Sequence, residues 1–389
     1  MAVRIALQCS EADASLILSE DNTAARLLSR PGEAIYNDAN GLIEGNSPFQ
    51  IVWLDDDARE RYLEEIQNLA RKRQLPPQPL VIFEGNAPSE LSENTELWKY
   101  ASGAIPPAAA PTIWLGDSVA IKEPTHLVLR RQAGANLAIV GQDETLAASM
   151  FCAALVSLAA QLPRARNPAG LTPIAAGQSV TDPSAGSRPR LYFLDGSLDG
   201  TPAAASLADT LAMLPLEVRI GRWRDSAPFL QELQAELQRR SATTDSAPPW
   251  FLFIFALHRF RDLRRAEDDY GFGLDSSRPA SPALLLNELL RDGPLLGMHT
   301  FLWCDTLTNL QRTLDRAAFR ELNFRIALQM SANDSSNFLD SPLASRLGPC
   351  RAYFYSEEQA KLEKFRPYGP PDPDWLRRLA QSLALQNQR

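Results

Sequence analysis

The chain has 389 residues, of which 45% are hydrophobic and 22% are charged, and its formal net charge is −8. This length suits one large domain with an extra piece, or two domains, and the apolar share is sufficient for a packed core. The acidic balance argues against a free-standing nucleic-acid binder, which needs clustered Lys and Arg, but it leaves room for a local basic strip inside a larger assembly.

Cysteine, histidine and hydropathy patterns give no signature of a metal site or of a membrane segment. The four cysteines form no CxxC pair and the three histidines have no metal-ligand spacing, so we expect reduced thiols and no bound metal. No stretch approaches the roughly 20 apolar residues of a membrane span, and residues 1–15 lack the apolar run of a signal peptide. We therefore expect a cytoplasmic location.

The first 131 residues contain few predicted elements. An amphipathic helix is predicted at 55–74, because aspartates lie at its N-terminal end and basic residues at 71–73 lie at its C-terminal end, as the helix dipole favours. Residues 86–111 are rich in Pro, Ala and Ser and are predicted to be mostly loop. The predicted strands lie at 3–9, 79–84, 113–121 and 126–131.

From residue 136 onward, predicted strands alternate with predicted helices. The strands lie at 136–140, 191–194, 251–257, 299–304, 324–330 and 351–355. The helices lie at about 144–162, with Asp143 as the N-cap, and at 203–213, 226–240, 282–291, 306–321 and 374–386. Residues 163–189 are predicted to be a disordered insertion and residues 264–281 a charged loop. The alternation predicts an α/β fold with a mainly parallel sheet covered on both faces.

A short internal repeat links the two ends of the chain. Residues 4–8 and 325–329 both read RIALQ, at an offset of 321, and Ser10, Asp13 and Ser15 recur at that offset. The second copy ends a complete series of strands and helices, whereas the first has no such series before it. We interpret residues 1–54 as the C-terminal tail of a preceding module whose body is absent from this chain.

Three segments carry a family resemblance: RIALQMSANDSS at 325–336, GMHTFLWCDT at 297–306, and PPWFLFIFALHRFRDLR at 248–264. They resemble the FtsK/SpoIIIE-type P-loop motor ATPases of the HerA/FtsK superfamily, and they are also similar to EccC secretion ATPases, which string several such modules together. The resemblance implies a RecA-like P-loop fold, a three-layer α/β/α arrangement with a small N-terminal α+β extension. Its implied domains are the tail at 1–54, a connecting segment at 55–112, the module at 113–370 and a C-terminal helix at 371–389.

The phosphate loop of this module departs from the working pattern GxxxxGK[ST]. Leu146 stands at the second glycine, Ala147 at the lysine that neutralises phosphate charge, and Ala148 at the hydroxyl that binds magnesium. Two acids at the start of the following helix would repel an anion there. We predict a capped helix at a vestigial nucleotide site, whose loop comprises Gly141, Gln142, Asp143, Glu144, Thr145, Leu146, Ala147 and Ala148.

Other positions around this site are also altered. Phe255 stands where the family ends its Walker B strand with an acid, and it can neither hold magnesium nor orient water. Asp195 is either a residual metal ligand or a turn-forming aspartate, and Asp305 follows the sensor-like strand as a candidate polar site residue. A basic cluster is interpreted either as contacts to a neighbour's nucleotide or to DNA, or as a solvated patch; it comprises Arg259, Arg261, Arg264 and Arg265.

These features predict a non-catalytic module that acts as a structural or regulatory part of a multi-module, ATP-driven DNA translocase, with no ATPase activity of its own. The alternatives are an ATP-binding DNA translocase subunit and a cargo-protein binding module of a secretion-type motor ATPase. No cofactor is expected, and ATP with Mg²⁺ would bind only if the altered site still functions. The expected partners are other FtsK-like modules or subunits in an oligomer, with DNA or a cargo protein reached through the full assembly.

Overall fold

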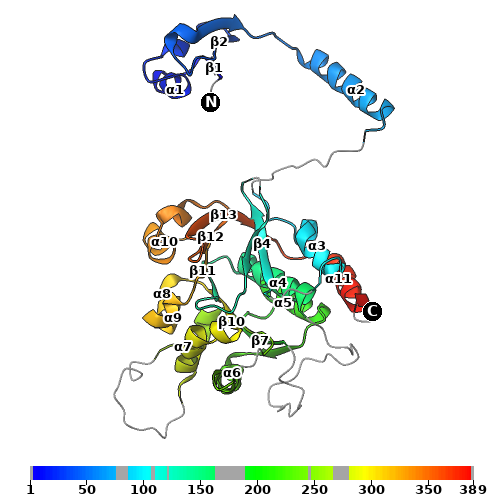
Figure 1. Cartoon of the computed structure of the whole chain (residues 1–389), viewed down its shortest axis with the longest axis vertical. Helices are drawn as coiled ribbons and strands as arrows, with labels where there is room; N and C mark the ends of the chain where they lie inside the picture. The colour runs from blue at the N-terminus through cyan, green and yellow to red at the C-terminus, as the bar shows by residue number, and fades with distance from the viewer. Residues whose placement is uncertain are drawn as a thin grey trace. The chain divides into compact units, whose positions relative to one another are not determined.

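The computed structural model describes residues 3–75, 86–106, 110–120, 122–162, 189–243, 247–265 and 280–386. The chain divides into two compact units, Met1–Phe83 and Glu84–Arg389 (Figure 1). The predicted strand at 79–84, nearly all of the predicted insertion at 163–189 and most of the predicted loop at 264–281 lie outside the described residues.

The second unit is built on a ten-stranded sheet with the order β5-β4-β13-β12-β11-β6-β10-β9-β7-β8. The strands from β11 to β8 in this order pair in parallel, and the strands from β12 to β5 pair antiparallel along one side. The predicted mainly parallel sheet is therefore confirmed. The strands are β4 Thr112–Ser118, β5 Thr125–Val128, β6 Leu137–Val140, β7 Arg190–Asp195, β8 Val218–Gly221, β9 Trp250–Phe255, β10 Met298–Cys304, β11 Phe324–Ala327, β12 Ala352–Ser356 and β13 Lys361–Pro367.

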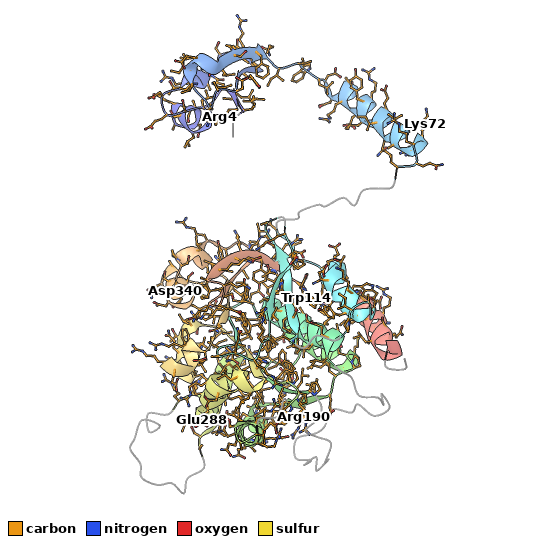
Figure 2. All side chains as sticks on the ribbon, viewed as in Figure 1. Arg4, Lys72, Trp114, Arg190, Glu288 and Asp340 are labelled. Carbon is orange, nitrogen blue, oxygen red and sulfur yellow. The ribbon has the colours of Figure 1, made fainter. Side chains whose placement is uncertain are left out.

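Helices cover both faces of this sheet and form two separate apolar cores (Figure 1). One core lies under α3 Thr95–Ala101, α4 Glu144–Gln161, α5 Pro202–Met213 and α11 Pro373–Gln386. The other lies under α6 Ser226–Ser241, α7 Pro282–Asp292, α8 Leu307–Thr313, α9 Arg316–Arg320 and α10 Ala332–Leu339. The result is the predicted three-layer α/β/α arrangement, and Figure 2 shows how densely the side chains fill it.

Helix α4 is apolar on all sides because it lies between the sheet and an outer layer of helices. Among the described residues it is the one helix long and apolar enough to cross a membrane, but 89% of that stretch is buried inside the unit. Its composition is therefore explained by its position in the core.

The structure departs from several predicted elements. Helix α3 lies inside the predicted loop at 86–111, where the surrounding Pro and Ser concealed a short helix capped by Asn94. The predicted helix at 306–321 is two helices, because the chain breaks at Leu314 and restarts at the N-cap Asp315. Strands β8 and β13 were not predicted, since β8 has only four residues and four of the seven residues of β13 are charged. The unit also exceeds the predicted 113–370, because α3 and α11 belong to its core.

The first unit contains a three-stranded antiparallel sheet in the order β1-β2-β3. Its elements are β1 Arg4–Leu7, α1 Glu11–Ile17, the 3-10 helix η1 Ala24–Leu27, β2 Glu33–Asn37, the 3-10 helix η2 Ile43–Gly45, β3 Asn46–Gln50 and α2 Asp56–Lys72. Helix α2 matches the prediction at 55–74 and is capped by Asp55, whose side chain accepts the Ala58 N–H. The extension is thus α+β, as predicted.

Candidate nucleotide site

The loop between β6 and α4 occupies the position that a phosphate loop takes in this fold. Strand β6 lies between β11 and β10 and leads through Gly141 into α4. Gly141 has a φ of +143°, and a Cβ there would lie 2.4 Å from the Cβ of Leu328. Only glycine is therefore accommodated at this turn.

Three polar backbone groups of this loop are bonded to the protein itself. The Asp143 carboxylate accepts the N–H of Leu146 at 2.9 Å, which confirms the predicted N-cap. The Gly141 N–H donates to the Cys304 carbonyl at 3.1 Å, and its carbonyl accepts the Trp303 Nε1–H at 2.9 Å. The two Gly141 bonds fasten the loop to β10, and the Asp143 cap occupies one N–H at the start of α4, where an anion would otherwise bind.

The three altered loop positions lie in the protein interior. Leu146, Ala147 and Ala148 are all buried and belong to the core between α4 and the sheet. In a working site the corresponding lysine and hydroxyl reach the phosphates and magnesium. Here the three side chains pack in the core. The other loop residues Gln142 and Thr145 are exposed.

An internal ion pair closes the start of α4. Arg259, in the 3-10 helix η6 Leu257–Arg259 that follows β9, binds both carboxylate oxygens of Glu144 at 3.0 and 2.9 Å. The same guanidinium donates to the Gly196 carbonyl at 2.8 Å. About a quarter of each side chain is exposed, 23% for Arg259 and 25% for Glu144. Arg259 therefore joins the ends of β7 and β9 to the start of α4.

This pair was not predicted, although both residues were singled out. Glu144 was expected to repel an anion, and Arg259 was assigned to a basic cluster that either contacts DNA or a neighbouring nucleotide or is a solvated patch. The two residues are 115 positions apart and follow β6 and β9, which β10 separates in the sheet, so no local sequence signal pairs them. A contact from Arg259 to any other anion requires this bidentate pair to open.

Phe255, which the family resemblance places at the Walker B position, is part of an aromatic cluster with Trp303 and Phe151. Its ring centroid lies 4.6 Å from that of Trp303 and 5.4 Å from that of Phe151 on α4. The next residue, Ala256, has a φ of +59° in the left-handed region, which turns the buried chain out of β9 toward Arg259. Such a conformation costs a non-glycine residue about 1–2 kcal/mol. Phe255 therefore packs in the core, and Ala256 sets the direction in which the chain leaves β9.

The remaining predicted residues lie apart from this pair. The Asp195 carboxylate accepts the Ser197 N–H at 2.8 Å, the geometry of a turn-forming aspartate. Arg264 donates to the His258 carbonyl at 2.8 Å, while Arg265 donates to the Gln311 carbonyl on α8 at 2.9 Å. Arg261 is exposed. Arg259, Arg264 and Arg265 thus bond to different partners.

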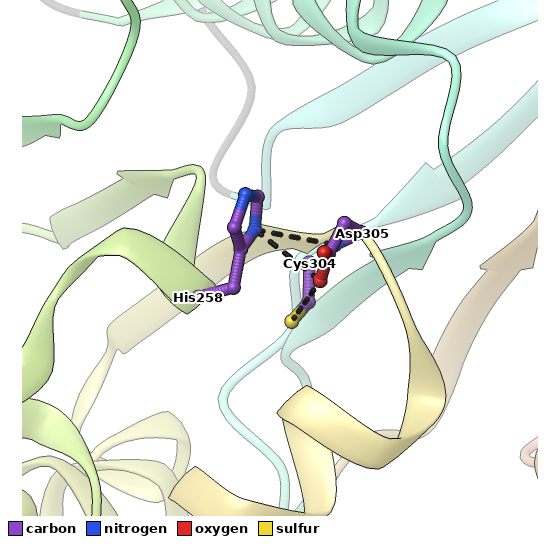
Figure 3. A group of neighbouring side chains, drawn as sticks. All are labelled: His258, Cys304 and Asp305. Carbon is purple, nitrogen blue, oxygen red and sulfur yellow. Dashed lines mark hydrogen bonds and ion pairs between the residues drawn. The ribbon is translucent and has the colours of Figure 1, made fainter.

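Asp305 lies in a trio with His258 and Cys304 at the ends of β9 and β10 (Figure 3). Its Oδ1 is 3.5 Å from His258 Nδ1, 3.7 Å from Cys304 Sγ and 2.8 Å from Asn309 Nδ2, which donates to it. The Asp305 N–H also approaches His258 Nδ1 at 3.3 Å, a contact that requires an unprotonated nitrogen. Of these three residues, only Asp305 was predicted as a site residue. The trio forms where two strands that are distant in the sequence end side by side, and the sequence does not show this.

Burial governs the protonation of this trio. It lowers the pKa of His258 more than the Asp305 carboxylate raises it, so the imidazole is neutral near pH 7 and its Nδ1 can accept the Asp305 N–H. Burial also raises the pKa of Cys304 to about 12, which keeps the sulfur a thiol. For Asp305, burial acts to raise the pKa, but the bond from Asn309 and the nearby His258 outweigh it and lower the pKa. The carboxylate is therefore the charged member.

A pocket of about 300 Å³ opens beside the loop. One wall comes from the start of α4 and the other from residues that follow β11 and precede β12. The lining residues are Gln142, Asp143, Leu146, Leu328, Gln329, Gly348, Pro349, Cys350 and Arg351. The size is at the lower end for a ligand site, and the Asp143 carboxylate lies in its wall.

No protein-family model and no curated protein sequence matches the chain. Its structure is similar to the cytoplasmic domain of the type VII secretion ATPase EccC from Thermomonospora curvata, with a TM-score of 0.52 and 16% identity. The chain has the fold of an FtsK/SpoIIIE-like P-loop ATPase. The match covers 99% of this chain and 44% of the EccC domain, so the chain spans less than half the length of that protein.

Two further solved structures are similar at lower scores. EssC (ATPases 2 and 3) from Geobacillus thermodenitrificans has a TM-score of 0.48 and 13% identity, covering 81% of this chain and 53% of that one. The pCW3 conjugation coupling protein TcpA has a TM-score of 0.47 and 11% identity, covering 92% of both chains.

Proposed function

We propose that the chain is a non-catalytic structural or regulatory module of a multi-module, ATP-driven FtsK-like motor. Its fold is that of the motor ATPases, but the positions that perform phosphoryl transfer carry Leu146, Ala147, Ala148 and Phe255. Positioning and charge neutralisation of the phosphates provide nearly all of the catalysis in such sites. A module without the lysine, the hydroxyl and the acid would lack these contributions.

The observation that carries the proposal is the Glu144–Arg259 ion pair across the start of α4. In a working module this end of the helix attracts phosphate, because its N–H groups point outward and its dipole is positive. Here the Asp143 and Glu144 carboxylates already lie there, and Arg259 neutralises one of them. An incoming triphosphate would face two carboxylates and would have to separate Arg259 from its partner.

A second candidate is a cargo-protein binding module of a secretion-type motor. Two observations favour protein cargo over DNA: the net charge of −8, and the use of Arg259 inside the chain. The similarity in fold to the cytoplasmic domain of a secretion ATPase is in keeping with this candidate and with a cytoplasmic location. Direct DNA binding would instead require a continuous basic surface and a steep dependence on salt.

Calorimetric titration of the purified chain with Mg²⁺ and the slowly hydrolysed analogue ATPγS tests the proposal. We expect no saturable binding at nucleotide concentrations up to the millimolar range. Arg259→Met is the test variant, and Arg261→Met is the matched control, because Arg261 is an exposed arginine on the same segment. Micromolar binding that Arg259→Met abolishes and Arg261→Met preserves would mean that Arg259 binds phosphate in place of Glu144, and the proposal would fail.

A further inference from the structure

The first unit repeats part of the second in structure as well as in sequence. Apart from η2, which has no counterpart, the elements β1, α1, η1, β2 and β3 have the same order as β11, α10, the 3-10 helix η10 Pro342–Arg346, β12 and β13. Both sets form three antiparallel strands with the same neighbours. The RIALQ segments lie at the same place in both sets, in the first strand and the turn that follows it.

Individual hydrogen bonds recur at the sequence offset of 321. The Ser10 hydroxyl caps α1 by accepting the Asp13 N–H at 3.2 Å, and Ser331 caps α10 by accepting the Asp334 N–H at 3.1 Å. Arg4, labelled in Figure 2, donates from Nη1 to the Ile17 carbonyl at 3.5 Å. Its counterpart Arg325 donates from Nη1 to the Phe338 carbonyl at 3.3 Å. Residues 4–17 and 325–338 therefore share the same local hydrogen bonds at these positions.

The surroundings of the two first strands differ sharply. Val3, Ile5 and Leu7 are 49%, 58% and 52% exposed. The residues at the same offset, Phe324, Ile326 and Leu328, are 3%, 0% and 3% exposed. Ala6 and Ala327, which point to the opposite face, are buried in both units. One face of β1 thus exposes a row of apolar side chains, whereas the equivalent row on β11 is buried.

The second unit shows what covers this row. Strand β6 pairs in parallel with β11, placing Leu137 opposite Phe324 and Ile139 opposite Ile326. Phe324 and Ile326 of β11 lie in the same core as α4. In the described part of the first unit, β1 is an edge strand that pairs with β2 alone. An exposed strand edge next to an exposed apolar row is an association surface. Another strand would bond the unpaired backbone groups of the edge, and a helix would remove the apolar side chains from water.

We propose that the β1 face, formed by Val3, Ile5 and Leu7 with the unpaired edge of β1, binds the body of another FtsK-like module. The occupant is a strand that runs parallel to β1 and leads through a glycine turn into an apolar helix, the equivalent of β6 and α4. This inference rests on the internal repeat and on the exposure of the apolar side chains of β1. It does not depend on whether the site beside α4 binds nucleotide.

Site-specific photo-crosslinking in the cells that produce the protein tests the proposal. One full-length variant carries a photo-reactive amino acid at Ile5, and the matched control carries it at Leu16, which is 83% exposed on α1. We expect position 5 to crosslink to the strand before the glycine loop of a P-loop module, or to the helix after it. Position 16 should not yield that peptide. Crosslinks to another class of protein or to a second copy of this chain, or no excess over position 16, would overturn the proposal.

A charge variant of the β1 face gives an independent readout. With the photo-reactive group at Val3, Ile5→Lys with Leu7→Lys should lower the crosslink yield at least about tenfold, because lysines would have to be buried against the partner. The melting temperature of the chain alone should not change, since both side chains are already exposed. An unchanged crosslink yield from Val3 in this variant would contradict the proposed interface.

Discussion

Removing Arg259 should lower the free energy of unfolding of the second unit, and the contacts of its guanidinium set the size of the loss. Arg259→Met leaves the Glu144 carboxylate and the Gly196 carbonyl without the guanidinium that binds both. Exposed ion pairs contribute about 0–1 kcal/mol, whereas breaking a fully buried pair costs about 3–5 kcal/mol. Both side chains are about a quarter exposed, so solvent screens part of the interaction. We expect a loss of about 2 kcal/mol in the free energy of unfolding.

A double-mutant cycle separates the ion pair from other effects of the substitution. Glu144→Gln should cost about 1 kcal/mol, and the double variant should cost about 1 kcal/mol less than the sum of the two single changes. For a unit as large as Glu84–Arg389, a loss of 2 kcal/mol lowers the melting temperature by about 3 °C in scanning calorimetry. Arg261→Met serves as the control and should not shift it. Additive single changes would refute the account of Arg259 as the partner of Glu144.

Three other predictions concern buried positions in the same unit. Ala147→Lys should destabilise the unit and give no ATP turnover, because it buries a charge and leaves the other lost groups unrepaired; thermal melting and phosphate release measure the two effects. Phe255→Asp should cost more than about 3 kcal/mol in urea unfolding, since it removes a fully buried ring and leaves an unpaired carboxylate beside Trp303. Burial lowers the pKa of His299 to about 4, so between about pH 6.5 and pH 4 the unfolded chain binds a proton that the folded chain does not. Stability should therefore fall by about 3 kcal/mol across this range, and His299→Gln should remove that part of the pH dependence of the urea midpoint.

The layered α/β fold could be predicted because it depends on local signals. Alternating apolar strands and capped helices mark the elements, and Asp143 marks the start of α4 one residue before it begins. Elements with weak local signals were missed. Helix α3 is only seven residues long, and strand β8 has four residues, two of them only half-buried.

The contacts that define the site could not be predicted in the same way. The Glu144–Arg259 pair and the trio around Asp305 join side chains from the ends of different elements. Periodicity indicates which face of an element is buried, but it does not fix which two loop residues meet. The losses at Leu146, Ala147 and Phe255 were visible as residue types, whereas their burial in the core was not.

The internal repeat shows a different kind of predictability. Five identical residues at one offset identified two equivalent segments, and the caps at Ser10 and Ser331 and the bonds of Arg4 and Arg325 recur accordingly. The interpretation of residues 1–54 as the tail of a preceding module remains a prediction, which the crosslinking experiment addresses.

Steady-state phosphate release by the purified chain, with saturating ATP and Mg²⁺, is the most direct test of the non-catalytic assignment. An intact P-loop motor ATPase in the same assay supplies the positive control. We predict release at the background rate, the same for the unaltered chain and for Arg259→Met. Turnover above background that is lost in Arg259→Met but retained in Arg261→Met would contradict the account, because it would make this site a working ATPase with an arginine in place of its lysine.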